Sequence, residues 1–238
     1  THTLQMISEA IKAVYASVFY HDSKTYMAAT KNLIDEEKMA IVLQEICGSV
    51  YDNRYYPSFS GVARSLNYYP IGNEKPEDGI ANIAMGLGKY IVDGGKTLRF
   101  SPAYPNNVLQ TSTLEFMLSE TQTFFNALDL NMVQFVPQVD DGFNLLRINV
   151  QDAIKDGTLQ YLASTYNVSD QMVYDGLYEG GRKIITFANI LQHNVFPLAE
   201  LLREILRIAQ EGMGRPVEIE FAVNLDYSAK KQHSFYLL

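Results

Sequence analysis

The chain has 238 residues, enough for one large domain or two small ones with a hydrophobic core. Hydrophobic residues make up 47% and charged residues 19%, which is typical of a globular protein rather than a disordered one. A formal net charge of −8 argues against nucleic acid or an anionic membrane surface as partner, because both bind basic surfaces. It does not exclude ATP, whose binding needs only local cations, backbone N–H groups and a metal ion.

Cysteine content and hydropathy exclude further classes of protein. Cys47 is the single cysteine, which rules out an intrachain disulfide and a cysteine-rich metal site. No apolar run approaches the roughly 20 residues that a membrane-spanning helix needs, and no segment resembles a signal peptide, so we expect a cytoplasmic protein. The chain begins at Thr1 and ends in an apolar run, 234–238, that reads as an unfinished strand, which predicts a fragment of a longer protein.

The first hundred residues contain two predicted helices and three predicted strands. Apolar side chains recur at helical spacing over 4–19, and Asp22 suits the start of a second helix running to Leu33. Residues 39–47 read as a buried strand that Gly48 ends. Two more short strands are expected at 60–66 and 79–84.

The remainder mixes both kinds of element. The expected elements are a helix over 113–128, a strand at 144–150, a helix over 168–178 and a strand at 183–187. A helix follows over 197–212, because Pro197 suits a first helical position and the next apolar residues lie on one face. A strand at 217–223 alternates strictly, and 234–238 could pair with it. Helices and strands without a regular strand–helix rhythm predict the α+β class.

Two acidic residues stand out on the strand at 217–223. Glu218 and Glu220 alternate with apolar residues, so both carboxylates lie on one face of the strand. Two such carboxylates repel each other unless a cation lies close by, and Mg²⁺ prefers carboxylate and phosphate oxygens. A solvated strand face explains the same pattern, and from composition alone it is the favoured interpretation.

Two other sequence features give no evidence of a binding or catalytic site. Gly94-Gly-Lys-Thr97 ends like a phosphate loop, but Tyr90 occupies the position where the full pattern needs a glycine. The four histidines show no metal-ligand spacing, and no residue is assigned a catalytic role.

Five short segments occur in an order that indicates a family. They span 10–19, 40–47, 60–63, 84–88 and 214–222, the last reading Gly214-Arg-Pro-Val-Glu-Ile-Glu-Phe-Ala222. Together they resemble the nucleotide-binding region of phosphoenolpyruvate synthase and pyruvate phosphate dikinase, where the last segment reads G-R-P-x-D-I-E-W-A. Residues 102–194 match little.

The resemblance implies an ATP-grasp-like nucleotide-binding domain. It would be partial, lacking the N-terminal part that grips phosphate and the last strand motif. On this interpretation 1–238 is one domain fragment, in which 1–100 forms the adenine-linker part, 101–195 a variable part and 196–238 the metal-ligand helix and strand.

The resemblance also implies site residues. Gln44, Glu45, Ile46 and Cys47 fall on the linker strand that holds adenine through backbone groups. Glu218 and Glu220 fall on the two acids that bind Mg²⁺ and the nucleotide phosphates, which favours metal ligands over a solvated face. Lys96 and Arg99 are candidates for additional cations near the phosphates.

The implied reaction transfers a phosphoryl group from Mg-ATP to pyruvate through a phosphohistidine domain of the same chain. The fragment alone is expected to be inactive and to bind ATP weakly. Two alternatives remain: an ATP-grasp phosphotransferase with a drug or glucan as acceptor, and a non-catalytic nucleotide-sensing module. The second would suit Lys89, which replaces the acid of the family's G-L-G-E motif.

Overall fold

The computed structural model describes residues 2–30, 40–131, 142–228 and 232–238. These residues form two compact units, which are described separately. The first comprises residues 1–46 and 131–144, and the second comprises Cys47–Leu130 and Leu145–Leu238.

The first unit contains two helices, α1 (His2–Ser17) and α2 (His21–Thr30). They confirm the predicted helices over 4–19 and from Asp22, and the predicted end at Leu33 lies outside the described residues. The predicted strand at 39–47 is wrong: the described residues 40–48 have no regular secondary structure. Val42 and Leu43 are 85% and 71% exposed. An apolar run becomes a strand only when another strand pairs with it, and no strand in the described residues does so.

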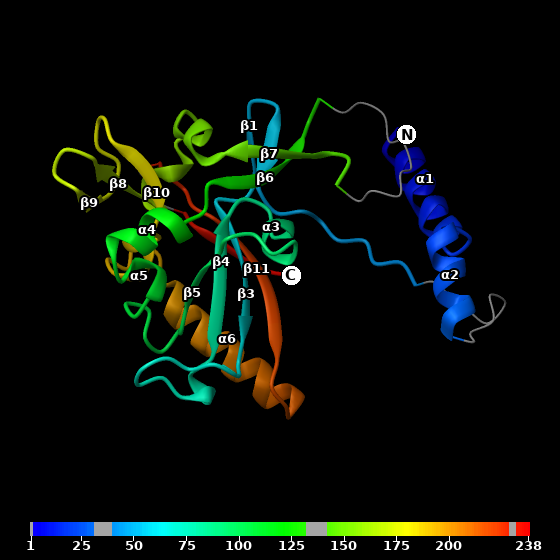
Figure 1. Cartoon of the computed structure of the whole chain (residues 1–238). Coiled ribbons are helices and arrows are strands. Elements are labelled where there is room, and N and C mark those ends of the chain that lie inside the picture. The colour runs from blue at the N-terminus through cyan, green and yellow to red at the C-terminus, as the bar shows by residue number, and fades with distance from the viewer. Residues whose placement is uncertain (1, 31–39, 132–141, 229–231) are drawn as a thin grey trace. The chain divides into compact units, whose positions relative to one another are not determined.

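The centre of the second unit is a five-stranded antiparallel sheet with the order β12-β11-β3-β4-β5 (Figure 1). It consists of β3 (Phe59–Arg64), β4 (Ile80–Met85), β5 (Leu98–Phe100), β11 (Glu218–Asn224) and β12 (Ser234–Leu237). The strands predicted at 60–66, 79–84 and 217–223 are therefore confirmed. The segment 234–238 pairs with β11, as the sequence suggested.

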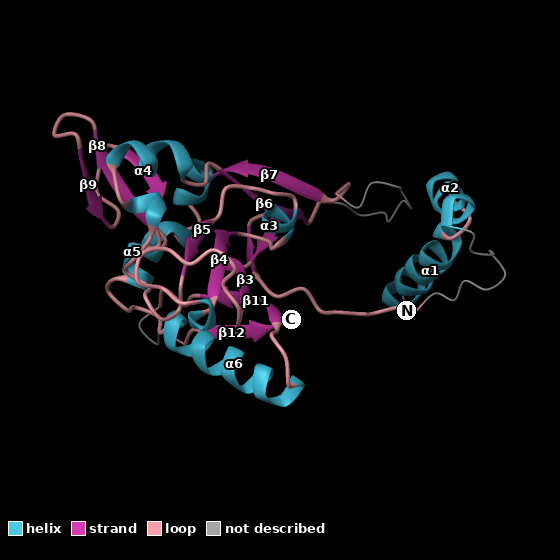
Figure 2. Cartoon of the chain, turned by 60° about the horizontal axis from the view of Figure 1, so that its bottom comes forward, coloured by secondary structure: helices cyan, strands magenta, loops and turns pink. Residues whose placement is uncertain are grey.

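Helix α6 (Leu198–Met213) packs along one face of this sheet (Figure 2). Its apolar face, with Leu198, Leu202 and Leu206, is buried in the same core as the sheet residues Phe59 and Phe221. The helix continues past Gly212 to Met213, and Gly214 caps it: Gly214 takes the left-handed conformation with φ of 64°, and its N–H donates to the Gln210 carbonyl.

Two smaller antiparallel sheets complete the unit. One has the order β1-β2-β6-β7 and the other β10-β8-β9. Their strands are β1 (Ser49–Tyr51), β2 (Arg54–Tyr56), β6 (Phe124–Asp129), β7 (Leu145–Asn149), β8 (Ala163–Asn167), β9 (Met172–Asp175) and β10 (Arg182–Ile185). The short helices are α3 (Lys89–Val92), α4 (Leu114–Glu120) and α5 (Ala188–Leu191), and the 3₁₀ turns are η2 (Pro76–Asp78), η3 (Leu109–Thr111), η4 (Val150–Ile154) and η5 (Thr158–Tyr161).

These sheets confirm the strands predicted at 144–150 and 183–187 and correct two predicted helices. The helix predicted over 113–128 is confined to α4, and the chain then enters β6, where Phe125 and Ala127 are buried with the period of a strand. The helix predicted over 168–178 is absent from the described structure, which has β9 paired with β8 in its place. In both places cross-strand packing overrides a helical reading of an ambiguous pattern.

The combination of packed helices and antiparallel sheets confirms the α+β class. Within the described ranges, no helix is long and apolar enough to cross a membrane.

Candidate nucleotide and metal site

Strand β11 presents two carboxylates on the face of the central sheet opposite its hydrophobic core. Glu218 and Glu220 are both exposed. Phe221, the next residue, points to the opposite face of the strand and is completely buried. The register with β3 places Glu218 opposite Arg64 and Glu220 opposite Val62. The alternation read from the sequence therefore does put both acids on one face of the sheet.

Arg64 lies beside the first of these acids. Its Nε donates to Glu218 Oε2, and both side chains are 49% exposed. The guanidinium therefore compensates one of the two neighbouring negative charges. Within the described residues, the side chain of Glu220 makes no hydrogen bond or ion pair, so its carboxylate is open to solvent and to a cation.

The same face continues across β4 and β5. Val62 lies opposite Asn82, and Asn82 lies opposite Arg99, so these side chains share the face that carries the acids. Arg99 Nη2 donates to Asn67 Oδ1 at 3.0 Å and to the Tyr69 carbonyl at 2.7 Å. We call the surface formed by Arg64, Asn82, Arg99, Glu218 and Glu220 the polar sheet face.

Lys96, the other candidate cation, is committed elsewhere. Its Nζ donates to the Ser119 carbonyl and lies 3.8 Å from a carboxylate oxygen of Glu120. Of the two basic residues suggested by their place in the sequence, only Arg99 lies on the polar sheet face.

The chemistry of this face fits a hard divalent cation. Glu218 and Glu220 supply carboxylate oxygens, which Mg²⁺ prefers, and Mg²⁺ commonly takes one or two carboxylates together with water and phosphate oxygens. Among the described residues, no group of three or more His, Cys, Asp or Glu side chains is arranged to hold a metal by itself. Water or the phosphate oxygens of a ligand would complete the coordination of an ion held by the two acids.

Three of the four predicted linker residues belong to the other unit of the chain. Gln44, Glu45 and Ile46 are exposed and belong to the first unit, while Cys47 begins the second. Of the residues that the resemblance singled out, the structure brings together Glu218 and Glu220.

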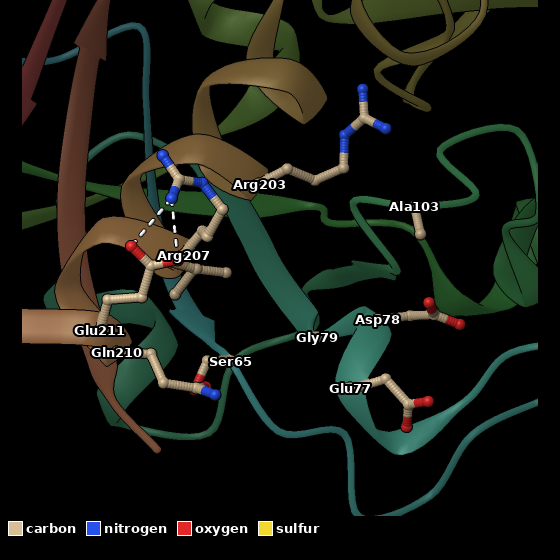
Figure 3. Close-up of a pocket in the computed structure, with 10 residues that line it drawn as sticks. Ser65, Glu77, Asp78, Gly79, Ala103, Arg203, Arg207, Gln210 and Glu211 are labelled. Carbon is tan, nitrogen blue, oxygen red and sulfur yellow. Dashed lines mark hydrogen bonds and ion pairs between the residues drawn. The ribbon is translucent and has the colours of Figure 1, made fainter. Parts of the chain in front are cut away.

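A cavity of about 430 Å³ elsewhere in the second unit is a poorer candidate (Figure 3). It lies between α6 and η2, and neither Glu218 nor Glu220 lines it. Its Arg207 is already held by Glu204 at 2.6 Å and by Glu211 at 2.8 Å. A guanidinium compensated by two carboxylates has little attraction left for a phosphate.

Sequence reasoning missed Arg64 and Asn82. The sequence signal for Arg64 is its even spacing from Ser60 and Val62 along a predicted strand. That spacing indicates the face of the strand on which Arg64 lies, but not its ion-pair partner. Glu218 is 154 residues away, and only the register of β3 with β11 shows that Arg64 and Glu218 meet.

Comparison with known proteins identifies the family of the chain. A search of curated proteins finds no match. The family described as "Pyruvate phosphate dikinase, AMP/ATP-binding domain" matches residues 1–238, the whole chain. The chain therefore belongs to the pyruvate phosphate dikinase AMP/ATP-binding domain family, as the five sequence segments had indicated.

Proposed function

We propose that the chain is an ATP-grasp-like nucleotide-binding domain whose polar sheet face holds Mg²⁺ and the phosphates of ATP. The observation that carries the proposal is the pair Glu218 and Glu220 on one exposed face, with Arg64 directly opposite Glu218. Mg²⁺ would be held by the two carboxylates, and when bound it neutralises charge on the β- and γ-phosphates. Gln44, Glu45, Ile46 and Cys47 would hold adenine through their backbone.

Arg64 has two roles in this proposal. Without nucleotide it compensates the Glu218 carboxylate and holds it on the sheet face. If Glu218 held a metal ion, Arg64 would lose part of this interaction, and its guanidinium would be available to a phosphate oxygen. Arginine suits this change of partner, because its planar set of N–H donors matches a carboxylate and a phosphate equally well.

The larger reaction is phosphoryl transfer from Mg-ATP to pyruvate, through a phosphohistidine domain of the same chain and in the cytoplasm. In the working protein 1–100 would serve the adenine, 101–195 would be the variable part, and 196–238 would supply the metal ligands. A drug or glucan as acceptor is the alternative within the same chemistry. The alternative with different chemistry is a nucleotide-sensing module that transfers no phosphoryl group. Lys89 favours it, because it replaces the acid of the family's G-L-G-E motif, and its Nζ lies 3.0 Å from Asp93 Oδ1.

The test uses Mn²⁺ with ATP, because Mn²⁺ replaces Mg²⁺ at oxygen sites and broadens nearby NMR signals even when binding is weak. We expect broadening of amide signals in β11 and β3. Glu220→Gln should reduce the apparent affinity at least about tenfold, since a charge-assisted contact contributes about 1.5–3 kcal/mol. Glu179→Gln, an exposed acid of a distant loop, is the matched control.

Stability must be followed in the same variants. Glu220→Gln should leave the free energy of unfolding unchanged, while Glu218→Gln should lower it by about 0.5 kcal/mol, because a half-exposed ion pair is lost. Broadening that survives in a Glu218→Gln/Glu220→Gln double variant would return both acids to a solvated strand face.

A further inference from the structure

A second polar cavity, of about 350 Å³, lies in the second unit along the edge of β10. Its other walls come from the segment between α4 and β6 and from the junction of β7 with η4, all of which can be followed in Figure 1. It shares no lining residue with the polar sheet face or with the cavity of Figure 3.

Two glutamines form part of its walls, and each side-chain amide pairs with the backbone N–H and carbonyl of one residue, as a neighbouring strand would. Gln122, which is 5% exposed, accepts from the Met85 N–H at 2.8 Å and donates to the Met85 carbonyl at 3.0 Å. Gln151 donates to the Lys183 carbonyl at 2.7 Å and accepts from its N–H at 3.4 Å. These amides are satisfied by backbone groups, so the walls are preformed and the glutamines need no ligand.

Thr121 is different, because its hydroxyl has no partner. The residue is 4% exposed, it lines the cavity, and within the described structure its Oγ1 is buried without a hydrogen bond. A buried hydroxyl without a partner is unfavourable, and a polar cavity beside it is a place where a bound molecule could satisfy it.

The charge of the lining indicates the kind of molecule. Among the described residues no carboxylate lines the cavity, although the chain carries a net charge of −8, whereas Arg182 and Lys183 both line it. The Lys183 ammonium is committed to the carbonyls of Tyr178 and Gly180. Arg182 is exposed and makes no ion pair among the described residues, so its guanidinium is available.

We propose that this cavity binds a small oxyanion, an organic carboxylate or a phosphate ester, through the Arg182 guanidinium and the Thr121 hydroxyl. A guanidinium offers paired donors that match either group, and a hydroxyl adds a donor to an oxygen. The volume lies in the range of small-molecule sites, about 300–1,000 Å³. Because the cavity shares no lining residue with the polar sheet face, its occupant is a second ligand, distinct from the nucleotide of the proposed function.

The test measures thermal unfolding and NMR shifts of the whole chain with inorganic phosphate, acetate or succinate, and with chloride at matched ionic strength. A ligand that binds only the folded state raises Tm in a saturable way. We expect a rise with phosphate or with a carboxylate, and shifts centred on Thr121 and Arg182. A response to phosphate alone identifies a phosphate compound, and a response to carboxylates alone identifies an organic acid.

Two variants decide the assignment. Arg182→Gln should weaken oxyanion affinity at least about tenfold. Thr121→Val should weaken it too, yet leave the unliganded chain as stable or more stable, because it removes an unsatisfied hydroxyl. Arg203→Gln, which changes an exposed arginine of the other cavity, should leave oxyanion affinity unchanged.

Three results would overturn the proposal. Chloride could raise Tm as much as the oxyanions, which would indicate screening only. Affinity could be insensitive to Arg182→Gln. Thr121→Val could destabilise the unliganded chain, which would mean that water already satisfies the hydroxyl. None of these results bears on Mn²⁺ and ATP at Glu218 and Glu220, so the two proposals fail separately.

Discussion

Removing Arg54 should destabilise the second unit strongly, because the Arg54 guanidinium neutralises the buried carboxylate of Asp156. Arg54 on β2 lies 2.7 Å from Asp156, and their side chains are only 11% and 4% exposed. Tyr56 donates to the other carboxylate oxygen at 2.5 Å. Burial first, and the hydrogen bond to Asp156 second, raise the pKa of Tyr56 well above its ordinary value, so the phenol remains a donor.

The magnitude follows from this burial. Breaking a buried ion pair by removing one partner costs about 3–5 kcal/mol, because the other charge stays in a poorly solvated place. Tyr56 still donates to Asp156 in Arg54→Met, so we expect a loss near the lower limit, about 3 kcal/mol. The double variant Arg54→Met/Asp156→Asn should recover most of this loss, since no charge then remains buried and the amide oxygen can still accept from Tyr56.

Urea unfolding of the whole chain measures these differences, with the dependence on urea unchanged between variants. Lys155→Met is the control, because Lys155 and Asp52 lie 3.8 Å apart with side chains 64% and 76% exposed, a pair expected to contribute under about 1 kcal/mol. A loss below about 1 kcal/mol in Arg54→Met, or a double variant as unstable as the two single losses added together, would refute the reasoning.

Two further predictions concern a glycine and a carboxylate. Gly61→Ala should cost about 1–3 kcal/mol, because its Cβ would lie 2.2 Å from the Phe221 ring. A Cβ added at Gly212 in α6 meets nothing within 4 Å, so Gly212→Ala should stabilise the chain by up to about 1 kcal/mol. If urea unfolding found the same change in stability for both variants, the packing argument would be wrong. Hydrogen bonds, first that from the Ser228 hydroxyl, lower the pKa of Asp226. A lowered folded-state pKa contributes stability above the unfolded pKa of about 3.9, which is lost as pH falls through the folded value. An NMR titration should therefore find Asp226 titrating below 3.8, and an ordinary midpoint would show that these bonds are not formed in solution.

Local pattern was enough for several elements and for the two acids of the candidate site. The helix over 197–212 follows from one continuous apolar face, and α6 has that face buried. The strict alternation over 217–223 places Glu218 and Glu220 on one side of any strand that those residues form. Both depend on periodicity within a single segment, which is a property of the sequence alone.

Tertiary structure decided the features that depend on which segments meet. Residues 40–48 and 168–178 have apolar patterns that fit more than one element, and pairing with another strand, or its absence, settles each. Arg64 reaches Glu218 across 154 residues of sequence. The 350 Å³ cavity brings Thr121, in the segment between α4 and β6, close to Arg182 on β10. No periodicity within one segment records such pairings, because strand register depends on packing among several segments at once.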